Sequence, residues 1–244
     1  FYDFAGSTLV HSVGGWGGLV IIYLLGARKG KFDSSGKAVA IPGSNIPLSA
    51  AGVLILWLGW FGFNGGSVLS ADPANTSLVL VTTCLAAAAG GLGASFLSSL
   101  MYKNLDITMF MNGVLGGLVG ITAGADQMGP TDAIIIGAIG GAVVVLGVAL
   151  LDKCKLDDPV GAIPVHLFAG IWGTLAVGLF GASAGFDQFM VQLASTGIVG
   201  VFCVVGAAII ALIVKSIMGL RVSNEEEEIG LDISEHGAKA YFSS

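Results

Sequence analysis

The chain has 244 residues, of which 55% are hydrophobic and 11% are charged. Because soluble domains carry roughly 25% charged residues and the mean hydropathy here is +0.89, the composition excludes an ordinary soluble domain and indicates a protein of the lipid bilayer. The formal net charge is −6, and we expect no nucleic-acid partner. The 39 glycines follow no Gly-X-Y period, so they favour closely packed membrane helices.

Seven apolar stretches meet or approach the roughly 20 residues that a helix needs to cross the hydrocarbon core. They are residues 4–25, 46–70, 77–102, 107–125, 133–151, 160–181 and 189–220. The sequence therefore predicts an all-α membrane protein with seven transmembrane helices. We expect the short, glycine-rich fourth stretch to be broken or irregular, and the seventh is long enough to tilt or to project beyond the bilayer.

The positive charges predict the orientation, since cytoplasmic loops are enriched in Lys and Arg. All ten Lys and Arg residues end or follow the first, third, fifth and seventh stretches, and the other loops carry Asp without Lys or Arg. We therefore expect a multi-pass protein of the plasma membrane with its N-terminal end outside and its C-terminal tail in the cytoplasm. Residues 1–221 form the predicted transmembrane domain. Residues 222–244 form a polar and acidic tail, and such a charge run is usually only solvated.

Two histidines lie in matched surroundings within the first and sixth stretches. Residues 3–15 read DFAGSTLVHSVGG and residues 158–170 read DPVGAIPVHLFAG. Counted from His11 and His166, both segments have Asp at −8, Gly at −5, Val at −1 and Gly at +4. The two helices lie five apart and must run in opposite directions. A repeat in antiparallel helices is typical of inverted-topology repeats, which place a substrate path near the midplane of the membrane.

The histidine pair suits a small, neutral, polar molecule. Burial disfavours the charged imidazole, and each neutral ring offers one N–H donor and one nitrogen acceptor. The alternative is that His11 and His166 each bond only to a neighbouring helix. Asp158 is interpreted as a helix cap, whereas Asp3 is placed to cap its helix and also to attract a cation at the outer mouth. Pro164 removes a helix hydrogen bond and is expected to bend its segment.

The second stretch ends WLGWFGFNGGS, which concentrates aromatic rings toward its outer end. Aromatic rings near a membrane interface are usually belt residues. Rings such as Trp60 and Phe63 beside the hydroxyl of Ser67 also suit a small cation, through cation–π attraction and a hydrogen bond. Both interpretations stay open from the residues alone.

Several long motifs in order carry a family resemblance. They are DFAGSTLVH, WFGFNGGS, NGVLGGLVGITAG, DDPVGAIPVH followed by GIWGTLAVGLF, and the tail GLRVSNEEEEIGLDISEHGAKAY. The chain resembles the later part of an ammonium transporter of the Amt/Mep/Rh family, in its bacterial Amt branch. The resemblance implies an eleven-helix inverted-repeat fold, of which these seven helices are the last part, and assembly as a homotrimer. We expect about four more helices upstream of Phe1, and we expect the 244 residues alone not to enclose a selective pore.

The resemblance also implies the site and its action. It assigns His11 and His166 to a twin-histidine pore, Asp3 to a position near the ammonium site, and Ser67 and Phe63 to the outer site and its gate. Trp60 falls in the aromatic motif of the same helix. Ammonium, or methylammonium as its analogue, would be recruited and deprotonated at the outer vestibule, and ammonia would pass the histidines. A PII-type signalling protein is the implied regulator at the tail.

Two other functions stay open, namely an ammonium sensor or transceptor and a passive channel for another small neutral molecule. An enzyme is not predicted, because no nucleophile set or metal set accompanies the histidines. The three cysteines are scattered without CxxC spacing, which argues against a zinc site and a disulfide framework. No cofactor is expected.

Overall fold

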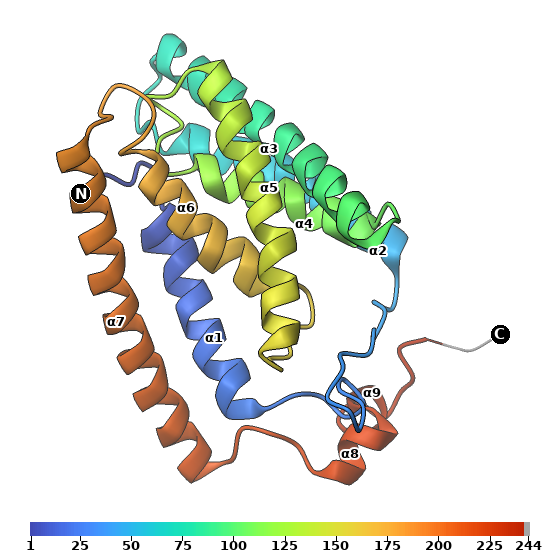
Figure 1. Ribbon diagram of the computed structural model, residues 1–244. Coiled ribbons are helices and arrows are strands. Elements are labelled where there is room, and N and C mark those ends of the chain that lie inside the picture. Colours follow the sequence, from blue (N-terminus) through green and yellow to red (C-terminus); the bar gives the residue numbers. More distant parts are fainter. Residues whose placement is uncertain (242–244) are drawn as a thin grey trace.

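The computed structural model describes residues 1–241, and in this range the chain is helical apart from its loops and one isolated bridge between Phe32 and Ala38. Figure 1 shows the arrangement of the helices. In chain order they are η1 (Ser7–Ser12), α1 (Val13–Leu25), α2 (Ile46–Gly66), α3 (Pro73–Tyr102), α4 (Ile107–Ile121), α5 (Pro130–Lys153), η2 (Pro164–Phe168), α6 (Ala169–Ala176), α7 (Phe186–Ile217), α8 (Asn224–Ile229) and α9 (Leu231–Ser234). The elements η1 and η2 are π-helical turns that lead into α1 and α6.

Five helices in the described range are long and apolar enough to cross a membrane. They are Ser7–Leu25, which joins η1 to α1, and the helices α2, α3, α5 and α7. The other two predicted stretches form shorter helices: α4 has 15 residues, and the sixth stretch forms η2 and α6, of 5 and 8 residues. The predicted length of the last helix is confirmed, since α7 has 32 residues.

The expectation that the fourth stretch, residues 107–125, is broken or irregular is confirmed only at its end. Helix α4 is regular from Ile107 to Ile121, and the irregular part is the run of turns that begins at residue 122. The glycines of α4 do not break the helix but allow α3 and α5 to pack closely against it. A Cβ added at Gly117 would collide with the backbone carbonyl of Ala86 in α3, and one added at Gly116 would lie 2.6 Å from Val144 Cγ2 in α5.

The helices α3, α4 and α5 form the centre of the bundle, and their backbones approach one another at small residues. A Cβ added at Gly141 of α5 would collide with the carbonyl of Gly90 in α3, and one added at Gly93 would lie 2.5 Å from the carbonyl oxygen of Ala138. Without a hydrophobic force between helices in lipid, such backbone contact is a main source of association. These glycines therefore set the distances between the three helices.

The long helix α7 lies beside α1 on the outside of the bundle (Figure 1). Its side chains are largely exposed, but Gln192 is fully buried. The Gln192 amide donates to the carbonyl of Tyr2 at 2.6 Å and to that of Thr174 at 2.9 Å, and its oxygen accepts from Tyr2 N at 2.8 Å. One side chain thus joins α7 to α6 and to the segment before η1.

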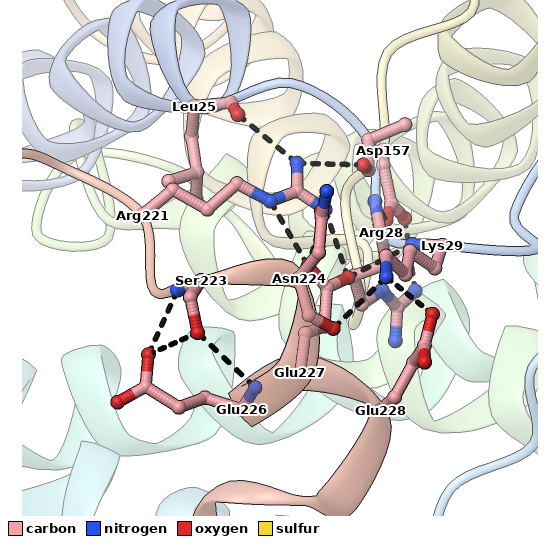
Figure 2. Close-up of polar contacts among 11 residues, drawn as sticks. Leu25, Arg28, Lys29, Asp157, Arg221, Ser223, Asn224, Glu226, Glu227 and Glu228 are labelled. Atoms are coloured by element: carbon pink, nitrogen blue, oxygen red, sulfur yellow. Dashed lines mark hydrogen bonds and ion pairs between the residues drawn. The ribbon is translucent and has the colours of Figure 1, made fainter.

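Charged groups join the loop after α1 to two other parts of the chain at one end of the bundle. Arg28 pairs with Asp157, and Lys31 pairs with Asp152 at the end of α5. The tail reaches the same loop, where the Glu227 carboxylate accepts from Lys29 N (Figure 2). Arg221 pairs with Glu227 and also donates to the carbonyl of Leu25 at the end of α1.

The predicted tail, residues 222–244, begins with the capped helix α8. Ser223 accepts a hydrogen bond from Glu226 N, and the Glu226 carboxylate accepts one from Ser223 N, which forms a capping box (Figure 2). Residues 242–244 lie outside the described residues. The part that is described therefore has its own local structure.

Candidate functional site

The two matched histidines touch. Nδ1 of His11 lies 3.2 Å from Nδ1 of His166, and the ring planes differ by 18°. In a neutral pair one Nδ1 donates and the other accepts, so the rings hold opposite tautomers. One Nε2 is then an N–H donor and the other is a bare acceptor. The pair can therefore both give and receive a hydrogen bond without carrying a fixed charge.

Aromatic rings from α2 cover the His11 side of the pair. Trp60 is stacked on His11 with ring centroids 4.9 Å apart and planes 15° apart. The Phe63 ring is tilted by 49° at 5.6 Å from His11. His11 itself is 8% exposed, and its Nε2 is buried without a hydrogen-bond partner within the described chain. A polar molecule that reaches this nitrogen would satisfy it, and an unsatisfied buried polar atom is otherwise costly.

The repeated Asp and Gly before each histidine perform the same structural task. Asp3 accepts from the backbone N–H groups of Thr8 and Leu9 at 3.0 and 2.8 Å. Asp158 accepts from three backbone N–H groups, the shortest at 2.7 Å from Ile163. The glycine five residues before each histidine has a positive φ, +109° at Gly6 and +77° at Gly161, which side chains rarely adopt. Both histidine helices thus begin with a capped, glycine-dependent turn.

The repeated Gly after each histidine lets the two helices cross at close range. A Cβ added at Gly15 would lie 2.6 Å from Leu167 N, next to His166. A Cβ added at Gly170 would lie 2.6 Å from Ser12 Oγ, next to His11. Each glycine therefore receives the residue that follows the other histidine. This reciprocal contact brings the two rings together.

The π-helical turns contain the histidines themselves, His11 within η1 and His166 within η2. The bend expected at Pro164 takes this form, since Pro164 is the first residue of η2. A π-turn departs from the i→i−4 ladder and is frequent at functional sites. The residue spacing predicted that the histidines lie on helices, but it did not predict the π-helical turns.

The remaining predicted site residues lie near the pair or farther along α2. Asp3 caps η1 with Oδ2, while its buried Oδ1 has no partner in the described chain. Ser67 ends α2, and its hydroxyl donates to the carbonyl of Phe63 at 2.8 Å. The structure therefore brings His11, His166, Trp60 and Phe63 into one cluster, with Ser67 one helical turn beyond Phe63.

Two cavities reach the histidines. The smaller, of about 320 Å³, is lined by both rings and by the small-residue face of Gly14, Gly15 and Gly18. The larger, of about 940 Å³, extends from His166 toward the end of the bundle that carries Arg28 and Asp158. His166 lines both cavities and so lies between them.

Sequence reasoning missed the polar groups that hold the aromatic cover in place. The Trp60 indole N–H donates to Thr122 Oγ1 at 3.1 Å, and Thr122 in turn donates to the carbonyl of Leu118 at 2.7 Å. Thr122 and Asn64 are both fully buried. The polar Thr in the run GITAG of the fourth stretch was the available signal, but nothing in the sequence paired it with Trp60.

Comparison with known proteins gives a consistent result. Residues 1–241 match the model of the Ammonium Transporter Family. The ammonium transporter Amt2 of Archaeoglobus fulgidus is 42% identical over 256 residues, which cover 98% of this chain and 55% of that protein. A putative ammonium transporter of Synechocystis sp. is 43% identical over 245 residues, covering 98% of this chain and 45% of that protein. The chain thus spans about half the length of the curated relatives it matches.

Solved structures show the same fold. A structure titled "Sensor Amt Protein" superposes with a TM-score of 0.93 at 34% identity, covering 96% of this chain and 60% of that one. The Mep2 protein of Candida albicans superposes with a TM-score of 0.84 at 26% identity, covering 97% of this chain and 56% of that one. With the family model matching nearly the whole chain, this multi-pass helical protein belongs to the ammonium transporter family, a family of membrane transporters and not of enzymes.

Proposed function

We propose that this chain forms part of a conduction path for ammonium nitrogen across the plasma membrane. The observation that carries the proposal is the contact between His11 and His166, whose Nδ1 atoms lie 3.2 Å apart beside a cavity that both rings line. Ammonia has N–H donors and a lone pair. A neutral pair with one free donor and one free acceptor is complementary to it, whereas a cation gains no fixed counter-charge from either ring.

The outer end of the path would recruit and deprotonate ammonium. Phe63 lies over His11, and Ser67 ends the same helix one turn beyond it. An aromatic face and a hydroxyl attract a small cation, and the free Oδ1 of Asp3 adds a negative charge to the outer mouth. Loss of the proton, to a chain of water molecules or to the histidine pair, follows from the cost of an unpaired cation in a low-dielectric path. Trp60 would then form the wall of the path beside His11.

The organisation of the chain supports this assignment. The reciprocal contacts of Gly15 and Gly170, and the matching caps of Asp3 and Asp158, are those expected of inverted repeats. We accordingly propose seven membrane crossings, with the N-terminal end outside and the tail in the cytoplasm. The described Lys and Arg pairs with the tail and with the end of α5 lie at one end of the bundle, as the positive-inside rule requires.

We further propose that residues 1–221 are the transmembrane domain and that residues 222–244 are a regulatory tail. The tail would contact a PII-type protein, and the transporter would act as a homotrimer. An ammonium sensor and a passive channel for another neutral molecule are the alternatives. A sensor would bind ammonium without appreciable flux, and a passive channel would show no methylammonium uptake. Methylammonium uptake therefore separates a transporter from both alternatives, and ammonium binding separates a sensor from a passive channel.

The test measures methylammonium uptake and current in proteoliposomes that hold the full-length transporter. His11→Ala and His166→Ala each leave the Nδ1 atom of the other ring, in a part-buried contact, without its partner, which costs about 1–3 kcal/mol. We therefore expect at least about a fivefold change in the ratio of current to uptake, at 1.4 kcal/mol per factor of ten. His236→Ala, the same substitution in the exposed tail, is the matched control. Wild-type uptake and current in both pore variants would refute the histidine path.

A further inference from the structure

The turn that begins the His166 helix is held from outside by one side chain. Asn112 Nδ2 in α4 donates to the carbonyl of Val160 at 3.0 Å. A carbonyl oxygen only accepts, so the amide nitrogen must be the atom that faces it. Val160 immediately precedes Gly161, whose φ of +77° turns the chain into the helix.

This hydrogen bond is connected to His166 by a short path. The carbonyl of Gly161 accepts from Val165 N at 3.2 Å, and Val165 directly precedes His166. The backbone of Gly161 lies against the amide, since a Cβ added there would be 2.9 Å from Asn112 Nδ2. A change in the position of the amide would therefore move the turn, and the turn would move the ring.

The matching turn before His11 is held differently. Phe4 N donates to the carbonyl of Ala123 at 2.9 Å, and Ala5 N donates to that of Thr122 at 3.0 Å. These carbonyls lie just past the C-terminal end of α4, where helix carbonyls lack partners within the helix. Backbone groups alone can therefore hold the outer turn.

The opposite end of α4 does not offer the same groups. Two of its first N–H groups are already taken, because Asp106 Oδ1 accepts from Thr108 N at 2.8 Å and from Met109 N at 3.4 Å. Pro159, next to Val160, has no N–H to donate. A side-chain donor is thus needed at this turn, and Asn112 supplies it.

We infer that Asn112 is a positioning residue for His166, which sets the contact between the two histidines by holding the Val160–Gly161 turn. The inference deepens the proposed function and rests on it for its transport consequence. Asn112 and His166 also line the same large cavity, so the amide lies along the route by which ammonia would leave the pair. Val165 also belongs to the same buried apolar cluster as Val114 and Leu118, but apolar contacts do not specify the direction of the turn as a hydrogen bond does.

The first measurement reports the histidine contact without using transport. The full-length transporter, with ¹⁵N-labelled histidine, is examined in lipid bilayers by solid-state NMR, since imidazole ¹⁵N shifts depend on tautomer and hydrogen bonding. Signals are assigned by their loss in single histidine variants. We expect Asn112→Ala to shift the His11 and His166 signals, and Asn112→Gln, which retains an amide donor, to lie closer to the wild type. Asn104→Ala, in the exposed loop before α4, is the matched control and should shift neither signal.

The second measurement is methylammonium uptake by the same variants. Loss of one neutral hydrogen bond corresponds to about a two- to tenfold change, and we expect a loss of that size in Asn112→Ala with wild-type uptake in Asn104→Ala. Unchanged imidazole signals in Asn112→Ala, equal shifts in the control, or wild-type uptake by Asn112→Ala would each overturn the inference. If the signals move while both histidine variants transport normally, the histidine path fails instead, so the two failures are distinguishable.

Discussion

Replacing Arg28 by Ala should destabilise the end of the bundle where the tail docks. Arg28 donates to the Asp157 carboxylate three times, from Nε at 2.7 Å, from an η-nitrogen at 2.8 Å and from its backbone N at 2.9 Å (Figure 2). The Asp157 side chain is 2% exposed, whereas that of Arg28 is 38% exposed. Water can therefore hydrate the Arg28 guanidinium when Asp157 is removed, but it cannot reach the Asp157 carboxylate when Arg28 is removed.

That difference sets the expected magnitudes. Arg28→Ala leaves a buried carboxylate with only a backbone N–H, and breaking a buried pair in this way costs about 3–5 kcal/mol. Asp157→Asn leaves a guanidinium that water can already reach, so the loss should be nearer the roughly 1–2 kcal/mol of its hydrogen bonds. Arg28→Ala should thus be the more destabilising change by about 2 kcal/mol.

The pair should also respond to acid. The hydrogen bond from Arg28 lowers the pKa of Asp157 below its ordinary value. A carboxyl whose pKa is lower in the folded state stabilises the fold fully above its unfolded pKa of about 3.9. That contribution is lost as the pH falls through the lowered folded pKa. The stability difference between wild type and Arg28→Ala should therefore be constant near neutral pH and shrink in this acidic window.

The assay is the free energy of unfolding of the full-length transporter, measured by titration with sodium dodecyl sulfate at a series of pH values. Lys37→Ala, an exposed change in the same loop, is the control and should remain within about 0.5 kcal/mol of wild type. If Asp157→Asn proved as destabilising as Arg28→Ala at neutral pH, the argument from unequal burial would be refuted.

Three further predictions concern packing, the site and the tail. Gly141→Ala should lower the fraction of monodisperse protein that survives heating, because its new Cβ collides with the backbone of α3, whereas Gly197→Ala meets nothing within 4 Å among residues 1–241 and should match wild type. Thr122→Val removes the acceptor of the Trp60 indole and should reduce methylammonium uptake about two- to tenfold; unchanged uptake would mean that the indole needs no such support. Truncation after Arg221 should alter uptake or its regulation without preventing membrane insertion, and unchanged uptake together with unchanged binding of a PII-type protein would identify the tail as merely solvated.

Hydropathy predicted the helices well where they were long. The five long apolar helices and the length of α7 follow from apolar runs, because every apolar residue in such a run raises the mean hydropathy of the same stretch. The regular helix over most of the fourth stretch was not expected, because glycine has two opposite uses. It weakens an isolated helix, but at Gly117 it admits the backbone of α3, and this contact outweighs the low helix propensity.

The candidate site was only partly predictable. The shared Asp and Gly positions around His11 and His166 indicated a related pair. Each of these residues contacts backbone within about two helical turns of its own histidine. The holding groups were not predictable. Thr122 meets Trp60 across 62 positions, and Asn112 meets Val160 across 48, and a single polar residue in an apolar helix does not identify its partner.

The sequence by itself determined that this is a helical membrane protein, which apolar stretches become its long helices, and that two histidines share the same flanking Asp, Gly and Val positions. Only the tertiary structure decided that the rings touch, that Trp60 is stacked on His11, and that both histidines lie in π-helical turns. The physical reason is that hydropathy and local capping depend on neighbours along the chain. The rotation of each helix and the depth of each crossing depend on which small residues meet, and that is settled only when distant helices pack together.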